Sequence, residues 1–207
     1  ITERLVGSEM CIRDRIYKNK KKFFLYGWLF GFGYFVSNLY WISISLTFDQ
    51  NFKFLIPFTI ILVPSFLALF YALVAYLFVV LKPNNNLSSF FLFSLIFGIV
   101  EFVRGSILTG FPWNLIAYSF SNQIEILNIT SVIGTYSFNL FCISLFTSPS
   151  IFILRENKKD ISICVAFLIT TMSFYILGSQ NLEKFNNQKV KKLDYKLRIL
   201  SSNIGID

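Results

Sequence analysis

The segment Leu87–Thr109 reads LSSFFLFSLIFGIVEFVRGSILT and holds only two charged residues, Glu101 and Arg104. It is longer than the roughly 20 apolar residues that an α-helix needs to cross the hydrocarbon core of a bilayer. In lipid, every backbone N–H and C=O group needs a partner within the protein, so this run is predicted to form a transmembrane helix. The segment decides the fold class, because most of the chain has the same character.

The composition extends this conclusion to the whole chain. Of its 207 residues, 55% are hydrophobic and only 14% are charged, and 26 are Phe. The mean hydropathy is +0.61. A soluble domain of this size has too much surface in contact with water for so many apolar residues. A soluble globular domain, a disordered chain and a disulfide scaffold are therefore excluded.

Apolar segments on either side of Leu87–Thr109 complete the prediction of an all-α polytopic membrane bundle with about five transmembrane helices. The predicted spans are 23–46, 54–81, 87–109, 127–154 and 161–178. We expect the fourth helix to begin a turn or two after position 127. The bundle as a whole is predicted to occupy residues 16–180.

The charges predict the orientation of this bundle. The formal net charge is +8, and most Lys and Arg residues stand in short blocks between the apolar runs. Cytoplasmic loops are rich in Lys and Arg, so the blocks Lys18–Lys22 and Arg155–Lys159 are predicted to be cytoplasmic. Segments 47–53 and 110–126 hold a single Lys between them and fit the outer side. The charge pattern lacks a basic face interleaved with aromatic residues, so nucleic acid is not an expected partner.

Both ends of the chain differ from the bundle. Residues 1–15 lack the Phe, Ile, Asn and Lys bias of the rest, and we interpret them as a non-native leader. Residues 181–196 are polar and are predicted to be a linker. Residues 197–207 begin with the run LRIL, which is typical of the first strand of an α/β domain, and the chain stops as this domain begins.

Glu101 and Arg104 are the strongest candidates for a functional role. They lie three residues apart, so they share one face of the helix. Ionisable groups within a membrane are costly and usually face the interior of the bundle or a wet cavity. The spacing leaves two interpretations open. The pair either neutralises itself and fixes the packing of helices, or it serves as a polar anchor for a lipid headgroup or for a loop over a site.

The segment Thr109–Trp113 follows the third span and reads TGFPW. Gly110 and Pro112 are expected to end the helix, and Phe111 lies between them. Trp113 and Trp41 are expected at the membrane interface, where Trp is enriched. The segment after Trp113, up to Ile126, is predicted either to lie along the membrane surface or to dip into it.

Other polar and small residues within the spans have structural interpretations. Gly27 and Gly31 have the spacing that lets two helices approach closely, and Asn139 is expected to form a hydrogen bond between helices. The chain has no His and three Cys, so neither a metal site nor a cofactor is expected. Cys142 and Cys164 lie within spans and are interpreted as small core residues.

Together these segments resemble the bacterial apolipoprotein N-acyltransferases, over roughly residues 16–207. The segments that carry the resemblance are Gly31–Gly33 with Trp41–Ser45, Glu101–Gly105, Leu108–Trp113 with Tyr118 and Ser119, Ile133 and Gly134 with Asn139, and Ser202–Ile204. The EFVRG and TGFPW blocks are the most specific of these.

The resemblance implies a membrane bundle followed by a nitrilase-like domain on the outer side of the bacterial inner membrane. Such an enzyme transfers an acyl chain from a phospholipid donor to the N-terminal diacylglyceryl-cysteine of a lipoprotein acceptor. The family's catalytic Glu, Lys and Cys lie in the nitrilase-like domain and form a thioester acyl-enzyme. They have no counterparts in this chain, which is therefore expected to be inactive by itself. The lipid bilayer is the third expected partner.

By the same resemblance, the candidate residues belong to the route by which substrates arrive. We hypothesise that Glu101 and Arg104 shape an entrance from the outer leaflet, with Trp113, Phe111, Pro112, Trp41 and Asn139 as further structural or substrate-contacting candidates. Two alternatives from other classes remain. One is a polytopic transporter with Glu101 as an ion site, and the other is a non-catalytic membrane anchor.

Overall fold

The structure is a computed structural model that describes residues 20–81, 85–107, 112–153 and 158–188. All regular elements within these ranges are helical, and none of the described residues forms a strand. Four helices dominate the chain: α2 (Lys20–Leu39), α3 (Ile56–Leu81), α4 (Asn86–Ser106) and α9 (Lys158–Asn186). Each lies in an apolar stretch long enough to cross a membrane. The predicted leader 1–15 and the predicted strand and domain start at 197–207 lie outside the described residues.

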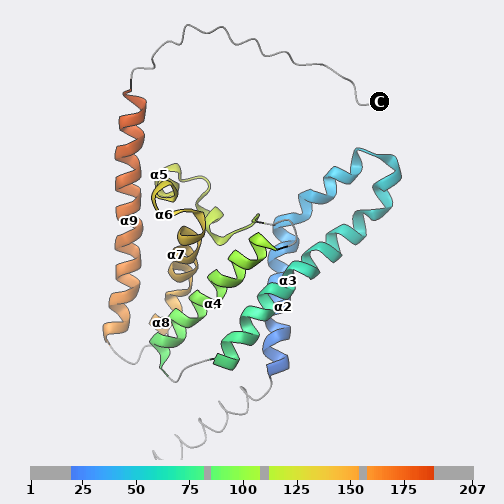
Figure 1. Cartoon of the computed structure of the whole chain (residues 1–207), viewed down its shortest axis with the longest axis horizontal. Helices are drawn as coiled ribbons and strands as arrows, with labels where there is room; N and C mark the ends of the chain where they lie inside the picture. The colour runs from blue at the N-terminus through green and yellow to red at the C-terminus, as the bar shows by residue number, and fades with distance from the viewer. Residues whose placement is uncertain (1–19, 82–84, 108–111, 154–157, 189–207) are drawn as a thin grey trace, which may run out of the picture.

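Shorter helices connect the four long ones. They are the 3-10 helices η1 (Tyr40–Thr47), η2 (Gln50–Leu55) and η3 (Ile116–Phe120), and the α-helices α5 (Ile124–Leu127), α6 (Thr130–Ile133), α7 (Thr135–Thr147) and α8 (Pro149–Ile153). As Figure 1 shows, α2 and α3 form a hairpin, α4 lies beside it, and α9 stands at the far side of the molecule.

The prediction of five long spans is corrected by the structure, because the range 127–154 is divided. The expectation that the main helix begins a turn or two after position 127 is confirmed, because α7 begins at Thr135, but α7 already ends at Thr147. Two residues account for the breaks. Gly134 precedes α7 with φ +80°, a backbone conformation that residues with a side chain rarely adopt. Pro149 opens α8, and its ring cannot continue a preceding helix without loss of a hydrogen bond.

Two other boundaries differ from the sequence-based expectation. The α-helix of the first span ends at Leu39, and the chain continues as 3-10 helix to Thr47. At the other end, α9 extends to Asn186 and so enters the range 181–196 that was predicted as a linker. Leu182, Glu183 and Lys184 are good helix formers, and extending an existing helix costs far less than starting one.

The predicted close approach of α2 to another helix is confirmed. A Cβ atom at Gly27 would lie 2.7 Å from the Ala75 Cβ, and one at Gly31 would lie 2.8 Å from the Tyr71 Cβ. Both neighbours belong to α3. Phe35 of α2, Tyr71 of α3 and Phe97 of α4 then meet in one aromatic cluster, with ring centroids 4.9–5.0 Å apart. This cluster is the core of the α2–α3–α4 unit.

The first residues of the segment between α4 and α7 pack into the bundle. Its η3 helix packs on α7, where Leu115, Ala117, Phe138 and Cys142 are buried in a second core. Phe120 at the end of η3 stacks on Phe146, with ring centroids 5.8 Å apart. Leu115 and Ala117 anchor the start of this segment in the bundle, whereas Tyr118 and Ser119 of η3 are exposed in the structure.

Candidate functional site

Glu101 and Arg104 form a buried ion pair on α4. The Arg104 Nη2 atom lies 3.0 Å from the Glu101 Oε1 atom. Glu101 is 1% exposed and Arg104 is 2% exposed, so neither charge reaches the surface of the bundle. The pair spans three residues of one helix, so α4 holds both side chains on the same face without help from another element.

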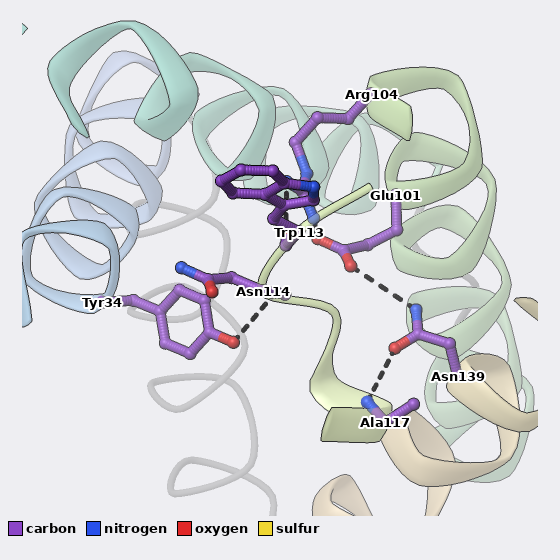
Figure 2. Close-up of polar contacts among 7 residues, drawn as sticks. All are labelled: Tyr34, Glu101, Arg104, Trp113, Asn114, Ala117 and Asn139. Carbon is purple, nitrogen blue, oxygen red and sulfur yellow. Dashed lines mark hydrogen bonds and ion pairs between the residues drawn. The ribbon is translucent and has the colours of Figure 1, made fainter. Parts of the chain in front are cut away.

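Arg104 also holds the segment that follows α4. Its Nη1 atom donates a hydrogen bond to the backbone carbonyl of Trp113 at 3.0 Å. The guanidinium carbon lies 5.3 Å from the centre of the Phe35 ring on α2, within cation–π range. Arg104 therefore connects α4 to the segment that follows it and to α2. Figure 2 shows the guanidinium between Glu101 and Trp113.

Asn139 of α7 completes the network from the other side (Figure 2). Its Nδ2 atom donates to the second oxygen of Glu101 at 3.5 Å. Its Oδ1 atom accepts a hydrogen bond from the Ala117 backbone N–H at 3.0 Å. One amide thus connects the ion pair to the start of η3. Asn139 is 1% exposed, so these bonds form away from water.

Tyr34 of α2 supplies a further contact to the same loop. Its hydroxyl donates a hydrogen bond to the backbone carbonyl of Asn114 at 3.0 Å. Asn114 itself has φ +58°, in the left-handed region that Asn tolerates better than most residues. The loop is thus held at Trp113, Asn114 and Ala117 by three helices. We call residues 112–117 the tethered loop.

Two Trp side chains mark one end of the tethered loop. The Trp41 and Trp113 rings stack with centroids 5.3 Å apart and an angle of 20° between their planes. Both are about half exposed, at 45% and 48%. Pro112 precedes Trp113 and is half-buried. Phe111 lies outside the described residues.

The sequence is similar to a family of known proteins. The profile of the apolipoprotein N-acyltransferase N-terminal domain matches residues 7–147. The chain belongs to the apolipoprotein N-acyltransferase family. A relative named apolipoprotein N-acyltransferase from Rhodopseudomonas palustris is 39% identical over 184 residues, which cover 87% of this chain and 34% of the relative. One of the same name from Rickettsia bellii is 30% identical over 202 residues, which cover 97% of this chain and 39% of the relative.

The chain therefore spans little more than a third of the length of these N-acyltransferases. No solved structure matches it significantly. The matched profile includes all the residues of the network, from Tyr34 to Asn139.

An apolar groove borders the ion pair in this N-acyltransferase domain. It has a volume of about 330 Å³. It runs along α3 and is lined by Leu62, Val63, Phe66, Leu67 and Phe70, together with Arg104 and Ile107. The predominantly apolar lining suits a hydrocarbon chain, and the buried Arg104 side chain forms one edge of the groove.

The described part of the chain offers no reactive centre beside this groove. Cys142 is fully buried in the second core. Cys164 donates to the Ser148 carbonyl at 3.1 Å. Among the described residues, no cluster of three or more His, Cys, Asp or Glu residues is suited to hold a metal ion.

The structure brings together most of the site residues predicted from sequence. Glu101, Arg104, Trp113 and Asn139 share one network, and Trp41 joins it through the Trp113 ring. Tyr34 and Asn114 were missed. Tyr34 is one of many aromatic residues of α2, and nothing in its spacing marks it out. The Ala117 contact uses only a backbone N–H and leaves no trace in the sequence.

Proposed function

We propose that this chain is the membrane part of an apolipoprotein N-acyltransferase of the bacterial inner membrane. The reaction is the transfer of an acyl chain from a phospholipid to the N-terminal diacylglyceryl-cysteine of a lipoprotein, through a thioester acyl-enzyme. Family membership and the relatives' names support this proposal. The role of the bundle is to carry the reacting domain and to bring two lipid substrates to it.

The observation that carries the proposal is the tethered loop. Arg104, Asn139 and Tyr34 fix its backbone at three points, and the apolar groove lies beside Arg104. Both substrates carry acyl chains, so they must approach from within the bilayer. A fixed loop at the end of α4 with an apolar groove beside it suits such an approach. We propose that the ion pair shapes this entrance in the outer leaflet.

The transporter alternative is less well supported by the same contacts. An ion or proton site at Glu101 would need a carboxylate that can exchange its partners. Both Glu101 oxygens accept hydrogen bonds, one from Arg104 and one from Asn139, and the side chain is 1% exposed. Binding an ion there would break the contacts that hold the tethered loop.

The function can be tested with a chimera. Residues 20–188 of this chain would replace the matched part of the Rhodopseudomonas palustris relative, and the product would be produced in cells depleted of their own N-acyltransferase. We expect mass spectrometry of a lipoprotein to show the third acyl chain. The unaltered relative is the positive control. A chimera that accumulates as a folded membrane protein but leaves the lipoprotein diacylated would contradict the proposal and favour a non-catalytic anchor.

A further inference from the structure

A second pocket lies on the α2 side of the tethered loop. Its volume is about 440 Å³. The polar residues that line it are Tyr34, Asn38, Asn114, Tyr118 and Ser119, and Phe146 of α7 contributes part of its apolar surface. This pocket shares no lining residue with the groove beside Arg104. The size and the mixture of an apolar wall with a few polar groups are typical of sites for small organic groups.

Asn114, which lines this pocket, has a side-chain donor without a hydrogen-bond partner in the part of the chain that the structure describes. The Asn114 Nδ2 atom is buried and has no hydrogen-bond partner among the described residues. Figure 2 shows its side chain on the same side of the loop as the Tyr34 ring. A buried amide donor without a partner costs free energy, so such a group marks a place where an acceptor is expected. The loop backbone on either side is already fixed by Arg104 and Tyr34.

The lining also limits the chemistry of the acceptor. None of the described residues that line this pocket carries a charge, and the nearby charges of Glu101 and Arg104 are paired with each other. A phosphate or an ammonium group would therefore lose its water without gaining a counter-charge, which is unfavourable. An uncharged carbonyl group has a much smaller free-energy cost of desolvation. The apolar surface from Leu115, Ile116 and Phe146 suits the first methylene groups of an acyl chain.

The position of the pocket relative to Trp41 also favours an ester carbonyl of a lipid as the acceptor. Tyr34 and Asn38 lie in the last turns of α2, one to two turns before Trp41. Trp41 stacks on Trp113, the neighbour of Asn114. Trp rings gather at the boundary between hydrocarbon and headgroups, and the glycerol esters of a lipid lie at that boundary.

We propose that this pocket binds the glycerol-ester region of a diacyl lipid, with the Asn114 side-chain amide donating a hydrogen bond to an ester carbonyl. The inference deepens the proposed function, on which it rests for the choice of lipids. Phospholipids and diacylglyceryl-cysteine peptides share this ester region and differ in their headgroups. A site that binds the shared glycerol-ester region would accept either lipid.

The test is photolabelling of the full chain in dodecyl maltoside, a detergent without ester groups. The probe is a diacylglycerol with a diazirine near the start of one acyl chain, and the matched probe is a dialkyl glycerol ether of equal length. We expect the diacyl probe to label the peptide that contains residues 114–119. The ether probe should need about 3- to 10-fold higher concentration, because it lacks the carbonyl acceptor.

Asn114→Gly is the informative variant. Glycine adopts positive φ without strain, so the loop conformation is kept while the amide is lost. We expect it to weaken labelling by the diacyl probe about 3- to 10-fold and to leave labelling by the ether probe unchanged. The matched control is Ser173→Ala, because the Ser173 hydroxyl donates only to the Ile169 carbonyl of its own helix. Thermal unfolding of both variants in the same detergent checks that they fold.

Competition separates the two lipid sources. Unlabelled phosphatidylethanolamine and an S-diacylglyceryl-cysteine dipeptide are added in turn, and whichever reduces labelling is a source of the bound ester group. Failure of both to compete would overturn the proposal. So would equal labelling by the ester and ether probes, or full labelling of a folded Asn114→Gly variant. The assay measures binding and needs no acyl transfer, so it can fail while the chimera remains active, and the reverse.

Discussion

At the scale of single residues, the molecule depends on two charges that stabilise each other inside the bundle. Glu101 and Arg104 are each about 1–2% exposed and lie 3.0 Å apart. Removing two ions from water is expensive, and their attraction repays the cost only when the remaining hydrogen-bonding groups also find partners. Here Asn139 and the Trp113 carbonyl supply such partners. A variant that removes only one of the two charges should therefore be less stable than the intact protein and than a variant that removes both charges.

Glu101→Gln should reveal this asymmetry. The variant keeps the shape of the side chain but leaves the Arg104 charge buried without its counter-charge. We expect the free energy of unfolding in detergent to fall by about 3–5 kcal/mol. The double variant Glu101→Gln with Arg104→Met should lose less than Glu101→Gln alone. Glu183→Gln, at an exposed position of α9, is the control and should change little. Equal stability of Glu101→Gln and the control would show that the pair is not coupled.

Asn139→Ala tests the link between the ion pair and the tethered loop. It removes the donor to Glu101 and the acceptor for the Ala117 N–H, and it leaves that N–H buried. We expect a loss of about 2 kcal/mol in thermal or chemical unfolding. Asn181→Ala is the matched control, because its side chain bonds Asn128 at an exposed site. If both variants lost the same small amount, the Asn139 contacts would not be a significant part of the fold.

At the scale of elements, close packing of α2 on α3 brings Phe35 under the guanidinium and Tyr34 against the loop. Two glycines permit this approach, Gly27 and Gly31. Gly31 is buried against Tyr71 and Ala68 of α3, whereas a Cβ atom at Gly33, two residues further along α2, would meet nothing within 4 Å. The same helix therefore contains a glycine that packing requires and one that it does not.

Gly31→Val and Gly33→Val form a matched pair. A Cβ at position 31 would lie 2.8 Å from the Tyr71 Cβ and 3.1 Å from the Ala68 Cα, so the helices must separate. We expect Gly31→Val to lower the free energy of unfolding by about 1–3 kcal/mol. Gly33→Val should leave it unchanged or raise it slightly, because Gly is a poorer helix former than Val. A reversed order in the unfolding midpoints would show that α2 does not pack on α3 in this way.

How far the sequence predicts these elements depends on the range of the interactions involved. The long helices follow from apolar length, and the shared face of Glu101 and Arg104 follows from helical spacing. The contact between Glu101 and Asn139 joins positions 38 residues apart, and only the path of the loop brings them together. Gly134 and Pro149 divide the predicted fourth span. The apolar composition of residues 127–154 nevertheless led to the prediction of one continuous helix. Tyr34 and Asn114 meet through a backbone carbonyl, which no residue pattern encodes.

At the scale of the whole molecule, the number of crossings decides which side each end occupies. Four long apolar helices alone would return the chain to the side on which it began. In Figure 1, however, α7 and α8 lead back toward the end of the bundle where α4 starts, and α9 then runs in the opposite direction. We therefore propose that the broken pair α7–α8 acts as the fifth crossing. Lys20 then lies in the cytoplasm, and Asn51 and Asn187 both lie outside.

Cysteine labelling of intact spheroplasts tests this topology. In a background with Cys11→Ser, Cys142→Ala and Cys164→Ala, single Cys residues replace Lys20, Asn51 or Asn187. We expect a membrane-impermeant maleimide to label positions 51 and 187 directly, and position 20 only after the membrane is permeabilised. Labelling of position 187 only after permeabilisation would mean that α7–α8 does not cross the membrane.

We propose that the buried pair serves acyl transfer by holding the tethered loop. The most direct measurement is the rate of each half-reaction in the chimera with Arg104→Ala, compared at equal amounts of folded enzyme with Lys184→Ala as the control. Arg104→Lys should recover only part of the activity, because a single ammonium does not reproduce the fork of the guanidinium. We expect Arg104→Ala to slow both acyl-enzyme formation and transfer to the acceptor at least about tenfold, a barrier increase of about 1.4 kcal/mol or more. Normal rates for both half-reactions would contradict it.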